Sequence, residues 1–232
     1  EGRRAMLSEA EHRRIAEAVA AAEAGTSGEI VCVMAGEVSN YREVPLAWAA
    51  AVALLAPLVA LLFGADPAML TPWRQDWTVG HASAVGGALT PALETMIVAQ
   101  VVLFAVVAGL VSIPPVRRLL TPSPLKRRRV HRAALQQFLA TGLHLEAGRT
   151  GVVIFAARAD RRVEIVADDA IHAAVGDSVW NAAVAAVQNG MRKRDPAAGF
   201  VRAVQLCGDA LAQHFPASGP KQNAISDRLL EL

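Results

Sequence analysis

The sequence predicts an α/β fold, a small sheet flanked by helices as in an α/β/α sandwich, interrupted by a two-helix transmembrane hairpin. Short apolar runs rich in β-branched residues alternate with longer amphipathic segments, as is typical of α/β chains. Two long uncharged segments separate the first of these runs from the others. The 232 residues are 53% hydrophobic and 19% charged, a composition too apolar for a disordered chain.

The hairpin is predicted from the two uncharged segments. Residues 45–64 contain no charged residue, and about 20 apolar residues in a helix suffice to cross a bilayer core of about 30 Å. A second apolar run covers residues 95–113, interrupted only by Gln100, for which we expect an interhelical hydrogen bond. Buried core helices are the alternative, but these are rarely apolar on every side. We therefore assign residues 44–116 to a transmembrane hairpin.

Basic residues predict how the hairpin is oriented. The loop at residues 65–94 contains one basic residue against three acidic ones, whereas residues 114–132 contain seven basic residues and no acidic one. Because Lys and Arg beside a span stay in the cytoplasm, we expect the loop outside and both chain ends inside. The chain is then a multi-pass protein of a bacterial inner membrane, with its α/β domain in the cytoplasm.

Most of these basic residues form one group, here called the basic cluster: Arg117, Arg118, Lys126, Arg127, Arg128 and Arg129. A nucleic-acid patch is one interpretation, but no aromatic platform accompanies the cluster and the net charge of the chain is only +2. Its position beside a predicted span favours contact with anionic lipid headgroups. We therefore expect the membrane, and no nucleic acid, as a partner of this segment.

The residues on either side of the hairpin are predicted to form one domain. Ser8 and Glu11 form a capping-box pattern that begins a first helix. Residues 28–36 form a continuous apolar run, typical of a strand buried on both faces. Such a strand needs partners, and we place them beyond the hairpin at residues 150–157 and 161–167. An even number of spans returns the chain to the side where this sheet forms.

Three further helices complete the predicted domain, beginning at Ser123, at Asp177 or Ser178, and at Asp195. The two cysteines exclude a disulfide scaffold or an all-thiolate metal site, and we expect Cys32 and Cys207 to be small core residues. The expected division is residues 1–43 and 117–215 for the two parts of the domain, 44–116 for the hairpin, and 216–232 for a tail that docks through Ile225, Leu229 and Leu230.

Several stretches of this domain resemble the TPM domain, a thylakoid-lumen phosphatase-like family. They are LSEAEHRRIAEAV leading into TSGEIVCVMAG, then GRTGVVIFAARADRRVEIVADDAIHAAV, and DSVWNAAVAAVQNGMRKRDPAAGFVRAVQLCGDAL. The resemblance covers residues 5–37 and 118–215, with the hairpin as an insertion. It implies an α/β/α sandwich, and it associates the chain with weak acid-phosphatase activity, divalent-cation binding, and accessory or assembly roles beside membrane complexes.

The chain departs from this family at three points. Family members commonly carry an Asp shortly before the Leu-Ser of the first helix, whereas residues 2–5 contain no acid. The family often has a glycine-rich turn where this chain has Ala167, Asp168, Asp169 and Ala170. Most members also place the domain outside the cytoplasm, in contrast to the orientation predicted here.

Asp168 and Asp169 are the candidate metal ligands, for Ca²⁺ or Mg²⁺. They follow a predicted strand, at a sheet end where α/β domains build sites, and Asp160 or Asp177 is a further candidate oxygen donor. Neighbouring side chains of an extended segment point in opposite directions, so at most one faces a common ligand. The favoured alternative is an acidic turn that helps to cap the next helix.

The remaining candidates carry no recognisable catalytic motif. His131, His144 and His172 lack a second ligand at helical spacing, and the chain contains no HExxH, CxxC, GxSxG or glycine-rich phosphate loop. The sequence therefore favours a non-enzymatic, membrane-anchored module that binds a protein partner or helps to assemble a complex. The alternatives are a divalent-metal-dependent phosphatase, in which Asp168 and Asp169 hold the cation that activates a water, and an anionic-lipid sensor acting through residues 117–132.

Overall fold

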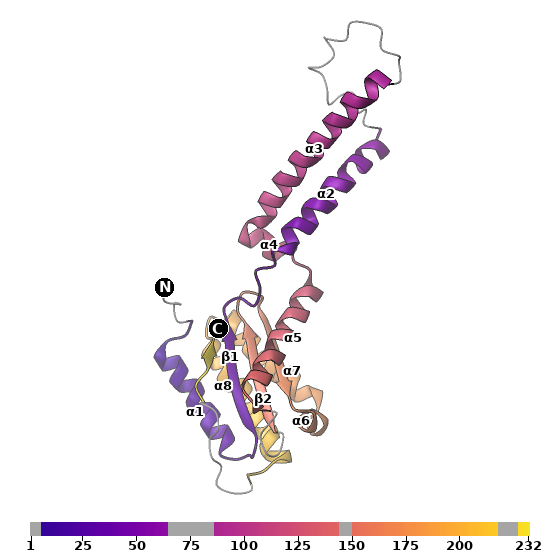
Figure 1. Ribbon diagram of the computed structural model, residues 1–232. Coiled ribbons are helices and arrows are strands. Elements are labelled where there is room, and N and C mark those ends of the chain that lie inside the picture. The colour runs from indigo at the N-terminus through magenta and orange to yellow at the C-terminus, as the bar shows by residue number, and fades with distance from the viewer. Residues whose placement is uncertain (1–5, 65–85, 144–149, 218–226) are drawn as a thin grey trace. The chain divides into compact units, whose positions relative to one another are not determined.

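The computed structural model describes residues 6–64, 86–143, 150–217 and 227–232 (Figure 1). The chain forms two compact units. One contains Glu1–Asn40 and Ser123–Leu232, here called the soluble unit, and the other contains Tyr41–Pro122, here called the hairpin unit. The soluble unit is therefore assembled from parts of the chain that lie on either side of the hairpin unit in the sequence.

A mixed four-stranded sheet forms the centre of the soluble unit, which confirms the predicted α/β fold. The strand order is β3-β2-β1-β4. β1 (Glu29–Ala35) lies parallel to β2 (Gly151–Ala157), with Glu29 opposite Gly151. β2 pairs antiparallel with β3 (Arg162–Ala167). Every residue of β1 and β2 is buried, as their continuous apolar sequences predict for strands covered on both faces.

Helices cover both faces of the sheet (Figure 1). One face packs against α1 (Glu9–Glu23), α6 (Asp169–Ala174), α7 (Asp177–Arg192) and α8 (Pro196–His214) through a core that includes Ile15, Ile171, Trp180 and Phe200. The other face packs against α5 (Ser123–Ala140) through Val130, Ala134 and Phe138. Cys32 and Cys207 are buried free thiols in the first core, which confirms their expected packing role.

The hairpin unit consists of α2 (Glu43–Leu62), α3 (Gly86–Ser112) and the short α4 (Pro114–Leu120). Two helical segments, Glu43–Leu62 and Glu94–Ser112, are long and apolar enough to cross a membrane. Within the unit the Gln100 side chain donates a hydrogen bond from Nε2 to the carbonyl oxygen of Ala53 at 3.1 Å. This contact between α3 and α2 confirms the interhelical role expected for Gln100.

Two described elements of the soluble unit go beyond the sequence prediction. The helix α6 follows β3 directly, and β4 (Leu230–Glu231) is a two-residue strand parallel to β1. β4 belongs to the tail, whose Leu229 is 2% exposed whereas Leu230 is 38% exposed. The tail therefore docks on the sheet as expected, and Leu229 is the leucine that anchors it, while Ile225 lies outside the described residues.

Candidate functional site

The acidic turn after β3 is held by hydrogen bonds to the start of β2. Asp168 donates its backbone N–H to the carbonyl oxygen of Gly151 at 3.1 Å, and its Oδ2 accepts from the Gly151 N–H at 3.2 Å. Asp168 is the N-cap residue of α6, but its side chain makes no capping hydrogen bond there. Asp169 is exposed in the first turn of α6. The Asp168 carboxylate therefore joins two strands, which differs from the helix-capping role that the sequence suggested.

Of the further oxygen donors considered for this turn, Asp160 lies apart from it. Asp160 is in the turn between β2 and β3, so the length of β3 separates it from Asp168, about 20 Å at about 3.3 Å per residue. Asp177 begins α7 and lines a cavity together with Ala167, the residue before Asp168. Among the described residues, no group of three or more His, Cys, Asp or Glu side chains lies close enough together to hold a metal ion.

Removal of the Asp168 carboxylate should destabilise the soluble unit. We expect Asp168→Ala to lower the free energy of unfolding by about 1–2 kcal/mol, because the buried Gly151 N–H loses the carboxyl oxygen that accepts its hydrogen bond. Asp169→Ala is the matched control and should stay within about 0.5 kcal/mol, as for other exposed positions. Urea unfolding of the full chain in detergent, followed by far-ultraviolet circular dichroism, measures both. Equal effects of the two substitutions would contradict the assigned role of Asp168.

A cavity of about 200 Å³ opens beside β3, and two of the candidate residues line it. Its lining consists of Ile165 and Ala167 from β3, His172 from α6, and Asp177, Trp180 and Asn181 from α7. The indole Nε1 of Trp180 is buried there without a hydrogen-bond partner in the described structure. The fold thus brings His172 and Asp177 to one small hollow, which offers a carboxylate, an imidazole and an amide above an apolar floor. Such a lining can hold a small polar molecule.

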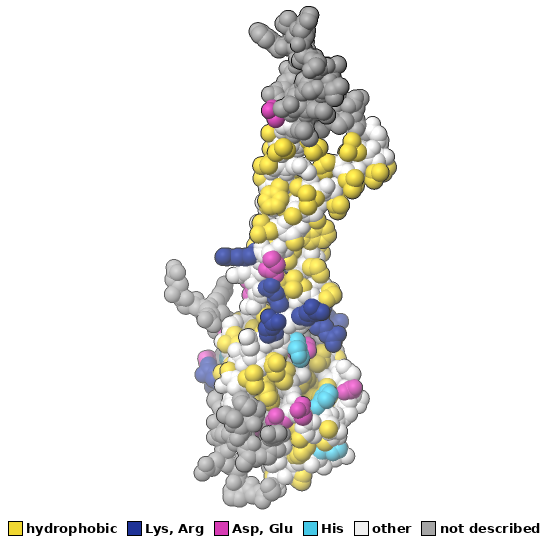
Figure 2. Space-filling view, turned by 45° about the vertical axis from the view of Figure 1, so that its right-hand side comes forward, with side chains coloured by type: hydrophobic (Ala, Val, Ile, Leu, Met, Phe, Trp, Pro, Cys, Tyr) yellow, Lys and Arg dark blue, Asp and Glu magenta, His cyan; other side chains and the backbone are white. Residues whose placement is uncertain are grey.

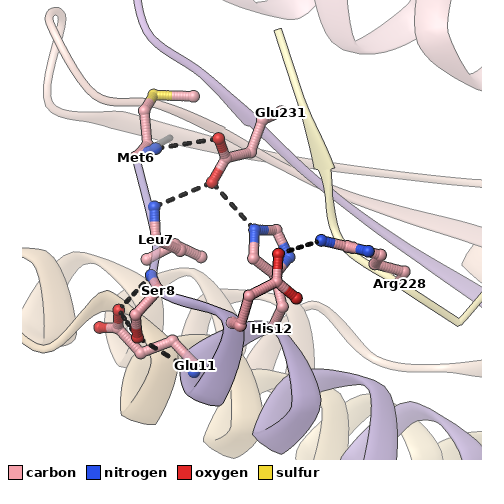
Figure 3. A network of polar contacts seen from close by, with 8 residues as sticks. Met6, Leu7, Ser8, Glu11, His12, Arg228 and Glu231 are labelled. Carbon is pink, nitrogen blue, oxygen red and sulfur yellow. Dashed lines mark hydrogen bonds and ion pairs between the residues drawn. The ribbon is translucent and has the colours of Figure 1, made fainter. Parts of the chain in front are cut away.

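A second group of polar contacts lies where the tail meets the start of α1 (Figure 3). The Glu231 carboxylate accepts hydrogen bonds from the backbone N–H of Met6 and of Leu7, each at 2.9 Å. The Nε2 atom of His12 lies 3.1 Å from the same carboxylate. No pattern in the sequence points to Glu231, since its partners are more than 200 residues away in the chain. Residues 2–5 lack the acid expected shortly before the Leu-Ser of the first helix. Glu231 of the tail nevertheless places a carboxylate beside Met6 and Leu7.

Glu231 titrates below its ordinary range. Burial acts to raise its pKa, but the hydrogen bonds from Met6 and Leu7 and the contact with His12 outweigh burial and hold the pKa below the ordinary value of 4.5. A carboxylate whose pKa is lower in the docked than in the released tail stabilises docking above pH 4.5. That contribution is lost as the pH falls from 4.5 through the lowered pKa.

This linkage gives a measurable pH dependence. We expect the amide resonances of Met6 and Leu7 to titrate together below pH 4.5 in ¹⁵N NMR spectra of the full chain, because both N–H groups bond the same carboxylate. The Glu231→Gln variant should lose this titration. A transition above pH 4.5, or one that persists in the variant, would show that another group controls these amides.

The basic cluster is divided between the two units. Arg117 and Arg118 lie in the last turn of α4, in the hairpin unit. In the soluble unit, Arg127 and Arg128 are exposed in the first half of α5, and Arg129 is partly buried with a guanidinium N–H that bonds Ser39 Oγ. Lys126 is partly exposed on the same helix. The structure thus places the cluster at the end of one unit and the beginning of the other along the chain.

The other titratable candidates have structural partners or lie elsewhere. His131 on α5 pairs through Nδ1 with Glu164 of β3 at 3.0 Å. His144 lies outside the described residues. Burial raises the pKa of the Cys207 thiol to about 12 and that of Cys32 in the same direction. Both thiols are therefore protonated at neutral pH and poor nucleophiles.

Comparisons with known proteins identify the fold of the soluble unit. Residues 118–210 match the family model of the TPM domain. Among solved structures, the chain is similar to the BA42 protein from the psychrophilic bacterium Bizionia argentinensis, determined by NMR. The TM-score is 0.54 at 15% sequence identity, over 99% of this chain and 98% of that one. No curated protein matches the chain.

Proposed function

We propose that this chain, of which residues 118–210 match the TPM domain, is anchored in a bacterial inner membrane and works there as a non-enzymatic interaction or assembly module. Its hairpin unit is the anchor. Its soluble unit, completed by the segments before and after the anchor, is the part that binds partners at the cytoplasmic face.

The exposed apolar surface of the hairpin unit is the observation that carries the anchoring (Figure 2). On α2, Leu54 is 70% and Leu55 56% exposed, and on α3 Val98 is 61% and Val101 62% exposed. In water, each large apolar side chain left exposed forgoes about 1.5–3 kcal/mol of burial free energy. A continuous apolar surface along two helices of spanning length is instead what hydrocarbon chains cover.

The charges beside the anchor support the cytoplasmic side for the soluble unit. The basic cluster follows α3 immediately, on α4 and the start of α5, and residues 114–132 contain no acid. Basic residues in short segments beside a span remain in the cytoplasm. Two spans return the chain to the side of the membrane from which it started, so both parts of the soluble unit lie in one compartment. The pairing of β1 with β2 requires this, because the two strands come from the two parts.

Several candidate catalytic groups are already held in structural contacts or buried, which supports an interaction role over catalysis. The Asp168 carboxylate bonds Gly151, His131 pairs with Glu164, and both thiols are buried. By contrast, α5 presents Leu135 and Leu139, 41% and 52% exposed, on its outer surface. Exposed leucines next to basic residues are typical of a protein-binding surface.

Alkaline extraction tests the anchoring. After expression in a bacterial host, the full chain should stay in the membrane pellet through a carbonate wash and leave it only in detergent. Recovery of the chain in the alkaline supernatant would overturn the proposal, because peripheral proteins are released under those conditions and spanning helices are not.

Calorimetry tests the alternative, a divalent-metal-dependent phosphatase. The full chain in detergent is titrated with CaCl₂ and MgCl₂ beside the Asp168→Ala/Asp169→Ala double variant. We expect the same heats for both proteins, since Asp168 already has a backbone partner. Saturable binding that the double variant lacks would establish the metal site and favour the phosphatase.

A further inference from the structure

The contacts of the tail, residues 227–232, are those by which proteins bind extended peptides. The Leu232 N–H donates to the Met34 carbonyl oxygen at 2.9 Å, and the Gly36 N–H donates to the Leu232 carbonyl oxygen at 2.8 Å. The tail therefore adds a parallel strand to the edge of β1. Main-chain pairing at a sheet edge provides affinity for any extended segment, and side-chain contacts then select the sequence.

Two side chains of the tail make the selective contacts. Leu229 is 2% exposed and joins the core of α1, α7 and α8. Two positions later, Glu231 points to the same side and places its carboxylate on the Met6 and Leu7 N–H groups and on His12 (Figure 3). We call the edge of β1, these two N–H groups and His12 the tail seat. It recognises a buried apolar side chain followed at the second position by a carboxylate.

The strand by which the tail pairs with β1 is short. β4 has two residues, and Leu230 and Leu232 remain 38% and 41% exposed. The pair between Arg228 and Glu9, at 2.8 Å, joins two largely exposed side chains and so contributes little. Short edge strands are among the segments that open by local unfolding without unfolding the domain. Detachment leaves the N–H of Gly36 and the carbonyl of Met34 open at a sheet edge, where strands of other chains pair.

We propose that the tail seat is the docking site for an extended segment of a partner protein. The chain's own tail competes with that segment for the seat. The partner segment lies parallel to β1 and carries a large apolar residue followed two positions later by glutamate. We infer these two residue types from the tail, because its Leu229 and Glu231 make the corresponding contacts with the seat. The proposal deepens the interaction role proposed above and rests on it for its biological purpose.

Fluorescence anisotropy with a tail peptide tests the proposal. The probe is a fluorescein-labelled, end-blocked peptide with the sequence of residues 225–232, and the protein is the full chain in detergent. Leu229→Asp releases the tail by placing a charge in the core, while Leu230→Asp is the matched control on the same strand, at a partly exposed position. We expect the peptide to bind the Leu229→Asp chain at least about tenfold more tightly than the wild type or the control, since an attached tail competes at high effective concentration.

The glutamate of the probe peptide allows a second binding measurement. A probe in which the glutamate is replaced by glutamine should bind the Leu229→Asp chain about tenfold more weakly, because the bonds from Met6, Leu7 and His12 then reach a neutral group. A chain lacking residues 227–232 replaces the Leu229→Asp chain if that variant loses its native circular dichroism. Equally weak binding to the opened and intact chains, or equal binding of the two probes, overturns the proposal. Neither result affects the extraction test, so a failed docking site is distinguishable from a failed anchor.

Discussion

Replacement of Leu55 by arginine is expected to abolish stable membrane integration, while the same replacement at Leu139 leaves integration and folding intact. The two leucines are equally exposed in the structure, at 56% and 52%. Leu55 lies near the middle of α2, where on the insertion scale arginine is about 3–4 kcal/mol less favourable than leucine. Leu139 lies on α5 of the soluble unit, where a surface substitution stays within about 0.5 kcal/mol.

Alkaline extraction of the two variants beside the wild type provides the measurement. A free-energy change of about 1.4 kcal/mol corresponds to a factor of ten in an equilibrium constant. The equilibrium constant for membrane insertion of the Leu55→Arg variant is therefore expected to fall by more than about a hundredfold. We expect this variant in the supernatant or degraded, and Leu139→Arg in the pellet. Identical fractionation of the two variants would mean that both leucines face the same solvent, and the hairpin unit would then not be a membrane anchor.

The second large effect is expected at the contact between α7 and α8. A Cβ atom added at Gly190 would lie 2.6 Å from the Gly199 Cα and 2.7 Å from the Asp195 carbonyl oxygen. Both are backbone atoms of a neighbouring segment and cannot turn aside as a side chain does. We expect Gly190→Val to lower the free energy of unfolding by about 3 kcal/mol through this overpacking, and to loosen the helix that lines the cavity with Asp177 and Trp180.

Gly176 provides the control for Gly190. A Cβ there meets only the Ser178 hydroxyl oxygen, at 3.9 Å, and its φ of −69° suits any residue. Gly176 is the N-cap residue of α7, where valine is less favourable than glycine, so Gly176→Val should cost no more than about 1 kcal/mol. Urea unfolding followed by circular dichroism compares the two variants. A loss of less than about 1 kcal/mol for Gly190→Val would mean that α7 and α8 separate easily and that the close helix crossing is not required.

The sheet and the hairpin unit were predictable because each has a strong pattern in the sequence. β1 and β2 are apolar at every position, which is what a strand covered on both faces needs. The length and apolar composition of α2 and α3 likewise predict spanning helices. Gln100 was recognisable for the same reason, since a lone amide among apolar residues must find a partner.

The tail contacts and the role of Asp168 were not predictable in this way. A strand of two residues has no periodicity, so β4 leaves no signal beyond an apolar run at Leu229 and Leu230. The bonds of Glu231 join residues separated by 225 and 224 positions, and only the folded chain brings them together. The Asp168 carboxylate turns to Gly151 because the β2–β3 pairing places that N–H beside it. Sequence position alone favoured a helix cap over a metal ligand there, and neither is the contact that the carboxylate makes.

Two-sided cysteine labelling tests the central claim, a soluble unit anchored at the cytoplasmic face. The native Cys32 and Cys207 are buried and carry raised pKa values, so they contribute little background. One variant carries Ser83→Cys between the spans and the other Gln136→Cys on the exposed surface of α5. We predict that a membrane-impermeant maleimide labels the Ser83→Cys variant in intact cells, and the Gln136→Cys variant only after permeabilisation. Labelling of Gln136→Cys in intact cells would contradict the account.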